Sequence, residues 1–510
     1  MIIEAILCVV FVIGSIIYAM QSLRNAQASG YKFVRVRGNA KFRLFELIIE
    51  CVVFITIIIL QFNHHLKIGI VFAILILHII YYGNRYISIR TKYRFTFRGT
   101  RLFILVAILL TSAHLIINVY LEKPTISLLC EFGLMMLSRI VVLLACYILM
   151  PFEALNNMRY IRKAKDVLDK LSAIKIGITG SFGKTSCKHI LTEMLSIKYK
   201  VIKTTKSYNT PLGICYSTLE VKGDEEIFIA EMGARNKGDV SKLCELVKPT
   251  YGIITGIGNQ HYESFKTHQA IYDTKKELVD AIPPQGYVVF NGENKKACAM
   301  SCQCKSETAV VHMTKKEGIY AQNVKLTNAG SSFEIVGLGK PMAVTTRLLG
   351  RHNIINILMC AALAYRLGLT SRDIASAISK LSPVKHRLAL VENSSLITII
   401  DDSYNANFEG VGFALEVLSQ FKGRKVVFTQ GIVELGKLQV ETNMMLGTML
   451  ANVADIVLLC GENSKAINNG LENARFQGEV YNCKSIEDAK THFSSILKAN
   501  DTLLIQNDIP

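Results

Sequence analysis

The chain has 510 residues, half of them hydrophobic, and a formal net charge of +18 at neutral pH. A chain of this length can form several domains, each with its own core. The positive charge does not indicate nucleic-acid binding, because the sequence shows no stripe of basic and aromatic residues and no known nucleic-acid motif. We therefore expect no nucleic acid among the partners of this protein.

The first 150 residues differ in composition from the rest of the chain. They contain 15 Lys or Arg and 5 Asp or Glu, separated by long apolar runs. Five runs are close to the roughly 20 residues that cross a bilayer as a helix, at 1–20, 44–62, 66–83, 101–120 and 126–150. The first does not resemble a cleavable signal peptide, because Glu4 stands where such peptides carry positive charge. Residues 1–150 are therefore predicted to form a transmembrane helical domain of about five spans.

Basic residues are distributed unevenly over the loops between these runs. The loops at 21–43 and 84–101 contain six Lys or Arg each, whereas the two intervening loops contain only Lys67 and Lys123. Loops rich in basic residues stay in the cytoplasm. The pattern predicts a multi-pass protein of the cell membrane, with its N-terminus outside and everything after Pro151 in the cytoplasm. Basic residues at these loops also favour contact with anionic lipid headgroups.

Two further features of the sequence leave their roles open. Glu131 and Arg139 lie two helical turns apart in the fifth run, where they could form a functional pair or simply bind each other within the bundle. The thirteen cysteines show no paired framework, and those of a cytoplasmic domain are expected to be reduced. Their one cluster, Cys298, Cys302 and Cys304, lacks an evident fourth ligand and is a weak signal for zinc.

A phosphate-binding loop is predicted after the basic connector at 151–173. Residues 174–179, IKIGIT, indicate a buried parallel strand, a glycine turn follows at 180–186, and a helical pattern begins at Cys187. In this arrangement backbone N–H groups and the helix N-terminus bind phosphate. Lys184 would reach the outer phosphates and Thr185 would coordinate Mg²⁺. The spacing differs from the standard P-loop, whose first glycine would fall at Ile178, so a purely structural turn is the alternative interpretation.

Motifs from this loop onward occur in the order found in the Mur ligases. The segment TGSFGKTS at 179–186 matches their ATP loop, TGxxGKT or TGxxGKS. Further segments follow collinearly: KSYNTPLGI at 206–214, IFIAEMGARNKGDV at 227–240, GNQHYESF at 258–265, TKKELV at 274–279, FNGEN at 290–294, LLGRHNIINILMCAALA at 348–364, and KHRL with DDSYNAN at 385–388 and 401–407. The chain therefore resembles the Mur ligases, most closely the type that adds D-alanyl-D-alanine in cell-wall synthesis.

The resemblance implies a multi-domain protein. An N-terminal transmembrane α-helical bundle would precede an α/β central ATP-binding domain at 174–382 and a Rossmann-like α/β C-terminal domain at 383–510, and strand and helix patterns alternate after Pro383 as that domain requires. Membrane segments take the place of the family's uridine-binding domain. The final residues, DTLLIQNDIP, lack the lysine, glycine and serine with which the family continues, which leaves the amine donor in doubt.

Individual residues can be assigned tasks on these grounds. Glu231 ends an apolar strand opposite the phosphate loop, where ligands collect in an open α/β sheet, and with Thr185 it would hold Mg²⁺. The resemblance adds His261 as a ligand of a second Mg²⁺ and Lys275 as a carbamylated metal ligand, with Lys276 as the rival position. It also implies nucleotide contacts from Gly180, Ser181, Gly183, Lys184, Thr185, Ser186, Asn291 at adenine, His352, Asn353, Asn356, Arg387 at the γ-phosphate and Asp402 at ribose. Substrate contacts would come from Asn209, Tyr404, Asn405 and Asn407.

The activity that the resemblance implies is an ATP-dependent acid–amino-acid ligase that works through an acyl phosphate and releases ADP and phosphate. Its catalytic residues would be Lys184, Glu231, His261, Lys275 and Arg387. Its partners would be ATP, two Mg²⁺ ions, a peptide-bearing cell-wall precursor that could be lipid-linked, and D-alanyl-D-alanine or a similar amino acid or dipeptide. Two alternatives stay open: a non-catalytic membrane scaffold with a nucleotide switch, and a ligase of the poly-glutamate or folyl-polyglutamate kind.

Overall fold

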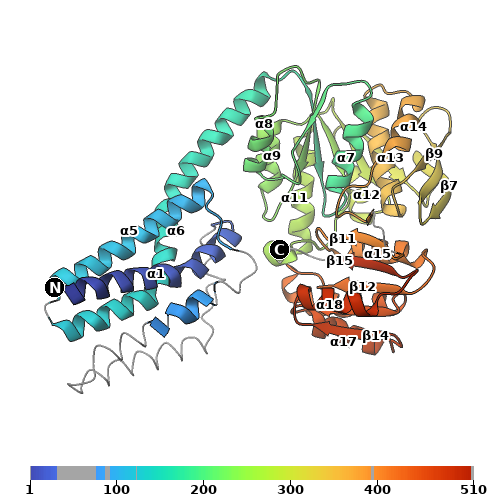
Figure 1. The fold of residues 1–510 in the computed structure, drawn as a ribbon. Helices are drawn as coiled ribbons and strands as arrows, with labels where there is room; N and C mark the ends of the chain where they lie inside the picture. Colours follow the sequence, from blue (N-terminus) through green and yellow to red (C-terminus); the bar gives the residue numbers. More distant parts are fainter. Residues whose placement is uncertain are drawn as a thin grey trace. The chain divides into compact units, whose positions relative to one another are not determined.

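The computed structural model describes residues 2–31, 76–77, 79–84, 86, 92–121, 123–391 and 396–506. The chain divides into two compact units, Met1–Arg159 and Tyr160–Pro510 (Figure 1). Each unit has cores of its own. The predicted fold class, a helical N-terminal region followed by two α/β domains, is confirmed.

Among its described residues, the first unit contains three helices that are long and apolar enough to cross a membrane. They are α1 (Ile2–Ala28), α5 (Phe97–Tyr120) and α6 (Pro124–Lys170). Leu23, Val106 and Val142 lie in a core between them, whereas Ile104 and Ile108 face outward. Outward apolar side chains are typical of helices in a bilayer. The predicted span at 44–62 lies outside the described residues, and so does most of the one at 66–83.

Helix α6 joins the predicted fifth span and the predicted connector in one continuous helix, with Pro151 inside it. Its last turns belong to the second unit, where Ala164 and Leu168 are buried in a core. Glu131 and Arg139, considered as a pair, have separate partners among the described residues. Glu131 binds His114 and Asn118, and the Arg139 guanidinium lies 4.6 Å from the centre of the Tyr18 ring.

The second unit begins with a nine-stranded sheet in the order β2-β3-β1-β4-β5-β6-β7-β8-β9. The first seven strands in this order are parallel and the last two pairings are antiparallel. The strands are β1 (Ile174–Thr179), β2 (Val201–Lys203), β3 (Ile227–Met232), β4 (Tyr251–Ile254), β5 (Tyr287–Asn291), β6 (Glu307–His312), β7 (Ile319–Thr327), β8 (Gly330–Val336) and β9 (Met342–Thr346). Because β1, β3, β4 and β5 are parallel, their carboxyl ends share one edge, where such sheets bind ligands.

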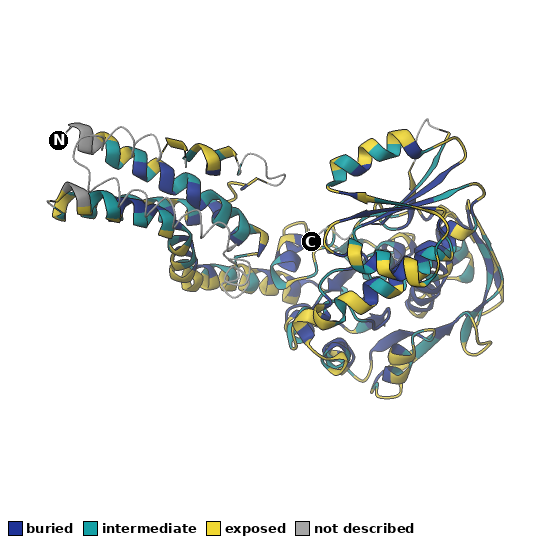
Figure 2. Cartoon of the chain, turned by 90° about the horizontal axis from the view of Figure 1, so that it is seen from below, coloured by how far each residue is buried: buried dark blue, intermediate teal, exposed yellow. Residues whose placement is uncertain are grey.

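Helices cover both faces of this sheet, because alternate strand residues point to opposite sides. Ile227 and Ile229 lie in one core and Phe228 and Ala230 in the other. Helices on the first face are α7 (Lys184–Leu195), α13 (Arg351–Arg366) and α14 (Ser371–Lys380). On the other face lie α8 (Pro211–Thr218), α9 (Asp239–Val247), α11 (His268–Ala281) and α12 (Lys295–Ser301), and the short α10 (Tyr262–Phe265) precedes α11. Figure 2 shows the buried strands between partly exposed helices.

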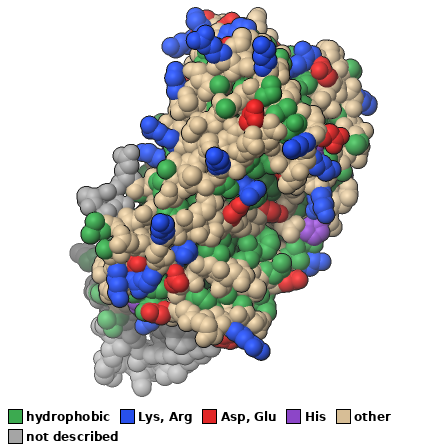
Figure 3. All heavy atoms as spheres, turned by 90° about the vertical axis from the view of Figure 1, so that its right-hand side faces the viewer, with side chains coloured by type: hydrophobic (Ala, Val, Ile, Leu, Met, Phe, Trp, Pro, Cys, Tyr) green, Lys and Arg blue, Asp and Glu red, His purple; other side chains and the backbone are tan. Residues whose placement is uncertain are grey.

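A second, six-stranded sheet follows in the order β10-β11-β15-β12-β13-β14 and is parallel except for β10. Its strands are β10 (Ala389–Val391), β11 (Thr398–Asp402), β12 (Lys425–Thr429), β13 (Ile456–Cys460), β14 (Glu479–Cys483) and β15 (Thr502–Gln506). Helices α15 (Phe408–Ser419), α16 (Gln439–Ala451) and α17 (Ser464–Asn473) cover one face and α18 (Ile486–Ile496) the other, and the 3-10 turn η1 (Gly436–Leu438) precedes α16. On the face that Figure 3 shows, Lys and Arg side chains are scattered among acidic and apolar ones.

Candidate active site

The loop between β1 and α7 has the backbone that a phosphate site requires. Gly183, the residue before α7, has a φ of 78°, and a Cβ there would lie 3.0 Å from Asn356 Oδ1. A Cβ at Gly180 would lie 2.1 Å from Thr255 Oγ1, so neither position accepts a side chain. No side chain caps the N-terminus of α7. Its first N–H groups and the helix dipole are therefore open to an anion.

Lys184 is the first residue of α7 and folds back over this loop. Its Nζ donates to the carbonyls of Gly180 at 2.7 Å and Ser181 at 3.2 Å. Burial lowers the pKa of Lys184 to about 8, against the opposing effect of Glu231. The ammonium is thus held beside the position that a phosphate would occupy, with its charge only weakly compensated.

Glu231, near the end of β3, collects polar groups from three directions and is 1% exposed. Thr185 Oγ1 lies 3.1 and 3.2 Å from its two carboxylate oxygens, and Asn209 Nδ2 donates to it at 3.3 Å. Lys188 Nζ, one turn after Lys184 on α7, forms an ion pair with Glu231 at 3.0 Å. A hydroxyl and a carboxylate at this separation suit a hard cation such as Mg²⁺.

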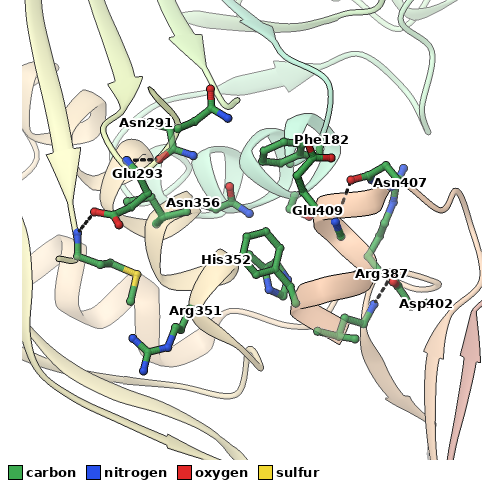
Figure 4. Close-up of a pocket in the computed structure, with 18 of the residues that line it drawn as sticks. Phe182, Asn291, Glu293, Arg351, His352, Asn356, Arg387, Asp402, Asn407 and Glu409 are labelled. Atoms are coloured by element: carbon green, nitrogen blue, oxygen red, sulfur yellow. Dashed lines mark hydrogen bonds between the residues drawn. The ribbon is translucent and has the colours of Figure 1, made fainter. Parts of the chain in front are cut away.

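A cavity of about 290 Å³ adjoins the loop and is lined on another side by residues of the second sheet domain (Figure 4). Of the residues predicted to bind nucleotide or substrate, it is lined by Gly183, Ser186, Asn291, His352, Asn356, Arg387, Asp402, Asn405 and Asn407. The other predicted residues, Gly180, Ser181, Lys184, Thr185, Asn209 and Tyr404, are not among its described lining residues, and neither is Asn353. Its Nδ2 donates to the Leu349 carbonyl at 2.9 Å, and the residue borders a smaller pocket beside Ser186.

Polar atoms in this cavity are held in fixed directions. Asn291 Nδ2 donates to the Thr255 carbonyl at 2.8 Å. The His352 ring stacks on Phe413 with centres 5.3 Å apart, and burial lowers the pKa of His352 to about 4, so the ring is neutral. Its buried Nδ1 has no hydrogen-bond partner among the described residues. A buried nitrogen without a protein partner beside a cavity can accept a hydrogen bond from a polar ligand or a water.

The second sheet domain contributes a cation and two polar groups to the phosphate side of the cavity. Arg387 Nη2 lies 3.5 Å from Thr185 Oγ1, and its guanidinium stacks 4.1 Å above the Tyr404 ring. Asp402 accepts the backbone N–H of Leu388 at 3.2 Å, and burial raises the pKa of Asp402 to about 7. Asn407 caps α15 by accepting the Gly410 N–H at 2.9 Å. Of these contacts, the one between Arg387 and Thr185 connects the two domains at the cavity.

Lys275 and its rival Lys276 lie in different environments on α11. Lys275 is 3% exposed and has no hydrogen-bond or ion-pair partner among the described residues, and burial, followed by the Lys184 charge, lowers its pKa to about 7. Lys276 forms an ion pair with Asp280 at 2.5 Å on the helix surface. Of the two side chains, Lys275 is the one that faces the interior.

His261 lies at the N-terminus of α10 and contacts the second domain. Its Nδ1 is hydrogen-bonded to Glu434, whose other carboxylate oxygen accepts Arg235 Nη1 at 2.7 Å. The pKa of Glu434 is lowered to about 2, mainly by the hydrogen bond that His261 donates to it. His261, Asn405, Asn407 and Glu434 also line a small pocket next to the cavity.

Sequence reasoning missed two charged residues of this site, Lys188 and Glu434. Lys188 follows Lys184 by four residues, so their shared helix face was a usable signal. Glu434 lies in a loop far along the chain, and no local pattern relates it to His261. The cysteine cluster at 298–304 acquires no His, Asp or Glu ligand among the described residues, whereas Cys483, Asp488 and His492 lie within 4.8 Å of one another.

A parallel sheet with a phosphate loop, facing a second α/β domain across a cavity, defines a two-domain nucleotide-binding protein. Comparison with known families identifies it further. Residues 178–364 match the Mur ligase middle domain and residues 386–506 match the Mur ligase, glutamate ligase domain. Together these matches cover more than half of the chain, which belongs to the Mur ligase family.

The chain is similar to the UDP-N-acetylmuramoyl-tripeptide–D-alanyl-D-alanine ligase of Bacillus subtilis, with 28% identity over 291 residues, 56% of this chain and 62% of the relative. It thus spans about three fifths of that curated relative. The MurF structure from Acinetobacter baumannii has a TM-score of 0.64 at 23% identity, over 69% of this chain and 77% of that one. The MurF ligase from Thermotoga maritima in complex with ADP has a TM-score of 0.62 at 24% identity, over 69% and 80%. Both structures show the shared fold.

Proposed function

We propose that this protein is an ATP-dependent ligase that joins a carboxylate to an amine. One observation carries the proposal: Lys184, the uncapped N-terminus of α7 and the Thr185 and Glu231 pair meet at one sheet edge, beneath Arg387. Such a site binds a triphosphate and balances the charge that develops when its outermost group is transferred. Transfer to a carboxylate gives an acyl phosphate, which an amine then attacks through a tetrahedral intermediate, releasing phosphate.

The residues present fit Mg²⁺ and adenine nucleotide. Thr185 and Glu231 supply oxygen ligands for one Mg²⁺, and His261 is proposed for a second ion. Bound Mg²⁺ would supply charge neutralisation at the phosphates. Asn291, His352 and Asn356 are proposed to face the base, Asp402 the ribose and Arg387 the γ-phosphate. Asn209, Tyr404, Asn405 and Asn407 are proposed substrate contacts.

Lys275 is proposed to carry a carbamate. A lysine with a pKa of about 7 is about half unprotonated at neutral pH, and only a neutral amine can add to CO₂. The neutral amine adds to CO₂ with formation of an N–C bond and release of one proton, which leaves an anionic carbamate in place of the neutral amine; starting from the ammonium form, two protons are released in all. The Lys275 side chain is buried and has no hydrogen-bond or ion-pair partner among the described residues. A carbamate on it would therefore be free to act as a metal ligand.

The proposed acceptor is a peptide-bearing cell-wall precursor joined to a lipid, and the proposed amine is D-alanyl-D-alanine or a similar small amino acid or dipeptide. Three long apolar helices in the first unit favour a bilayer location. We propose five spans, with the N-terminus outside and the ligase domains in the cytoplasm, where ATP is available. Confinement to a membrane raises the effective concentration of a lipid-linked substrate without any added contact.

The test is phosphate release by the full-length protein in lipid vesicles. Matched uridine-linked and polyprenyl-linked peptides are supplied with D-alanyl-D-alanine, and ADP and peptide products are identified by mass spectrometry. Faster turnover of the polyprenyl-linked peptide supports the proposal, and equal rates would reject the lipid preference. ATP binding without phosphate release for any acceptor and amine would instead favour a nucleotide-dependent scaffold.

A further inference from the structure

Glu434 connects the second sheet domain to two side chains of the nucleotide-binding domain. It lies in the loop between β12 and η1, and both of its carboxylate oxygens are used. One accepts Arg235 Nη1 at 2.7 Å and the other is bonded to His261 Nδ1. The Glu434 carbonyl also accepts the N–H of Glu263 at 3.0 Å. Side chain and backbone of one residue therefore fix the loop that carries His261.

The backbone at this contact is unusual on both sides. Glu434 and His261 each have a φ of 60°, in the left-handed region that residues with a side chain seldom adopt. Such conformations persist where surrounding contacts determine them, and they cluster at functional sites. Here the two left-handed residues are the ones that meet across the domains.

Hydrogen-bond chemistry sets the state of the His261 ring. An ionised carboxylate has acceptors only, so Nδ1 must carry the proton in its bond to Glu434. In a neutral ring the lone pair then lies on Nε2. Metal-binding histidines usually donate their other N–H to a carboxylate or carbonyl, which fixes the tautomer and strengthens the ligand.

We infer that Glu434 is a positioning residue that makes His261 Nε2 available as a metal ligand when the two domains are together. The inference rests on the proposed function, since it adds to the proposed Mg²⁺ site. It gives the C-terminal domain a role in assembling that site besides supplying Arg387.

Arg235 makes the inference sharply testable. Arginine has donors only, so in Glu434→Gln the amide oxygen faces Arg235 and the amide N–H group faces His261 Nδ1. Nδ1 must then accept, the proton moves to Nε2, and the ligand lone pair is lost. Glutamine is nearly isosteric with glutamate, so a merely structural role predicts little change. Adding Arg235→Met lets the amide turn its oxygen toward His261 and restores the lone pair on Nε2.

The experiment measures Mn²⁺, a paramagnetic substitute for Mg²⁺, by electron paramagnetic resonance on the full-length protein in detergent with ADP. We expect Glu434→Gln to weaken Mn²⁺ binding about 10- to 100-fold, the range found for residues that orient metal ligands. Arg235→Met alone should stay close to wild type, and the double variant should recover most of the loss. The control is Glu416→Gln, which breaks the 2.7 Å Arg351–Glu416 ion pair between the same domains.

Wild-type Mn²⁺ binding in Glu434→Gln, or a double variant as weak as Glu434→Gln, would overturn the inference. An equal loss in Glu416→Gln would assign the effect to domain contact in general and would overturn it as well. Binding is measured without turnover. A protein that shows the Mn²⁺ pattern but releases no phosphate therefore refutes the proposed function and leaves the role of Glu434 standing.

Discussion

The ion pair between Lys188 and Glu231 gives a quantitative prediction. Their side chains are 3% and 2% exposed and lie 3.0 Å apart. Removing one partner of a buried ion pair costs about 3 to 5 kcal/mol, because it leaves an uncompensated charge. Thr185 and Asn209 still donate to Glu231 in Lys188→Met, so we expect the lower end, about 3 kcal/mol. At about 2 °C per kcal/mol for a large domain, Tm should fall by about 6 °C.

Circular dichroism melting of the full-length protein in detergent, with a chelator, measures this shift. Mg²⁺ with ADP should recover most of it, because the cation would replace the lost ammonium beside Glu231. Lys200→Met is the matched control: Lys200 and Asp224 lie 2.7 Å apart, but they are 67% and 59% exposed. Exposed pairs contribute roughly 0 to 1 kcal/mol. A wild-type Tm for Lys188→Met, or a loss that Mg²⁺ and ADP leave unchanged, would refute the role of Glu231 as the buried metal-facing carboxylate.

Further outcomes follow from the site and the sequence. Lys184→Ala should abolish phosphate release. It should lower the free energy of unfolding by no more than about 1 kcal/mol, because the hydrogen bonds of Nζ go to two loop carbonyls. Release at the wild-type rate would place the active site elsewhere. Lys275→Ala should remove activity, and added acetate or formate should partly restore it; full activity without additive, with loss in Lys276→Ala, would show that the register is wrong. Asp402, with a pKa of about 7, becomes protonated as the pH falls from 8 to 6, so ADP affinity should fall over that range. Asp402→Asn should remove this pH dependence. If ADP affinity in Asp402→Asn changed with pH as in the wild type, Asp402 would not be the titrating group. A cysteine placed at Lys123 should react with an impermeant reagent from outside the cell, and labelling only after the membrane is broken would contradict the proposed topology.

The sequence was most informative where local patterns carry the structure. The strand IKIGIT, the glycine turn and the helix after it were predicted within a few residues, because apolar runs and glycines report local backbone directly. The domain boundary predicted at Pro151 does not coincide with the end of a helix, because α6 continues through that proline to Lys170. A proline inside a long helix can bend the helix without ending it.

Contacts between distant segments could not be predicted in the same way. Glu131 lies in the same apolar run as Arg139, yet its partners are His114 and Asn118 on α5. Glu434 is 173 residues from His261, and their contact depends on how two domains meet. Sequence patterns at periods of two and 3.6 residues describe one element at a time, so they contain no information on such pairs.

The charges around the phosphate loop explain why this arrangement suits a triphosphate. Lys184, Lys188 and Arg387 converge near one carboxylate, Glu231, so the site carries a net positive charge in a buried environment. Buried charges require compensation, and a nucleotide with several negative oxygens supplies it. Lys188 and the metal ion would then compete for Glu231, so binding of Mg²⁺ should displace or weaken the ion pair between Lys188 and Glu231. A carbamate on Lys275 would add the second anion that another Mg²⁺ needs. Under the proposed function, the charge of the partly neutral Lys275 would decide whether the site can hold one metal ion or two.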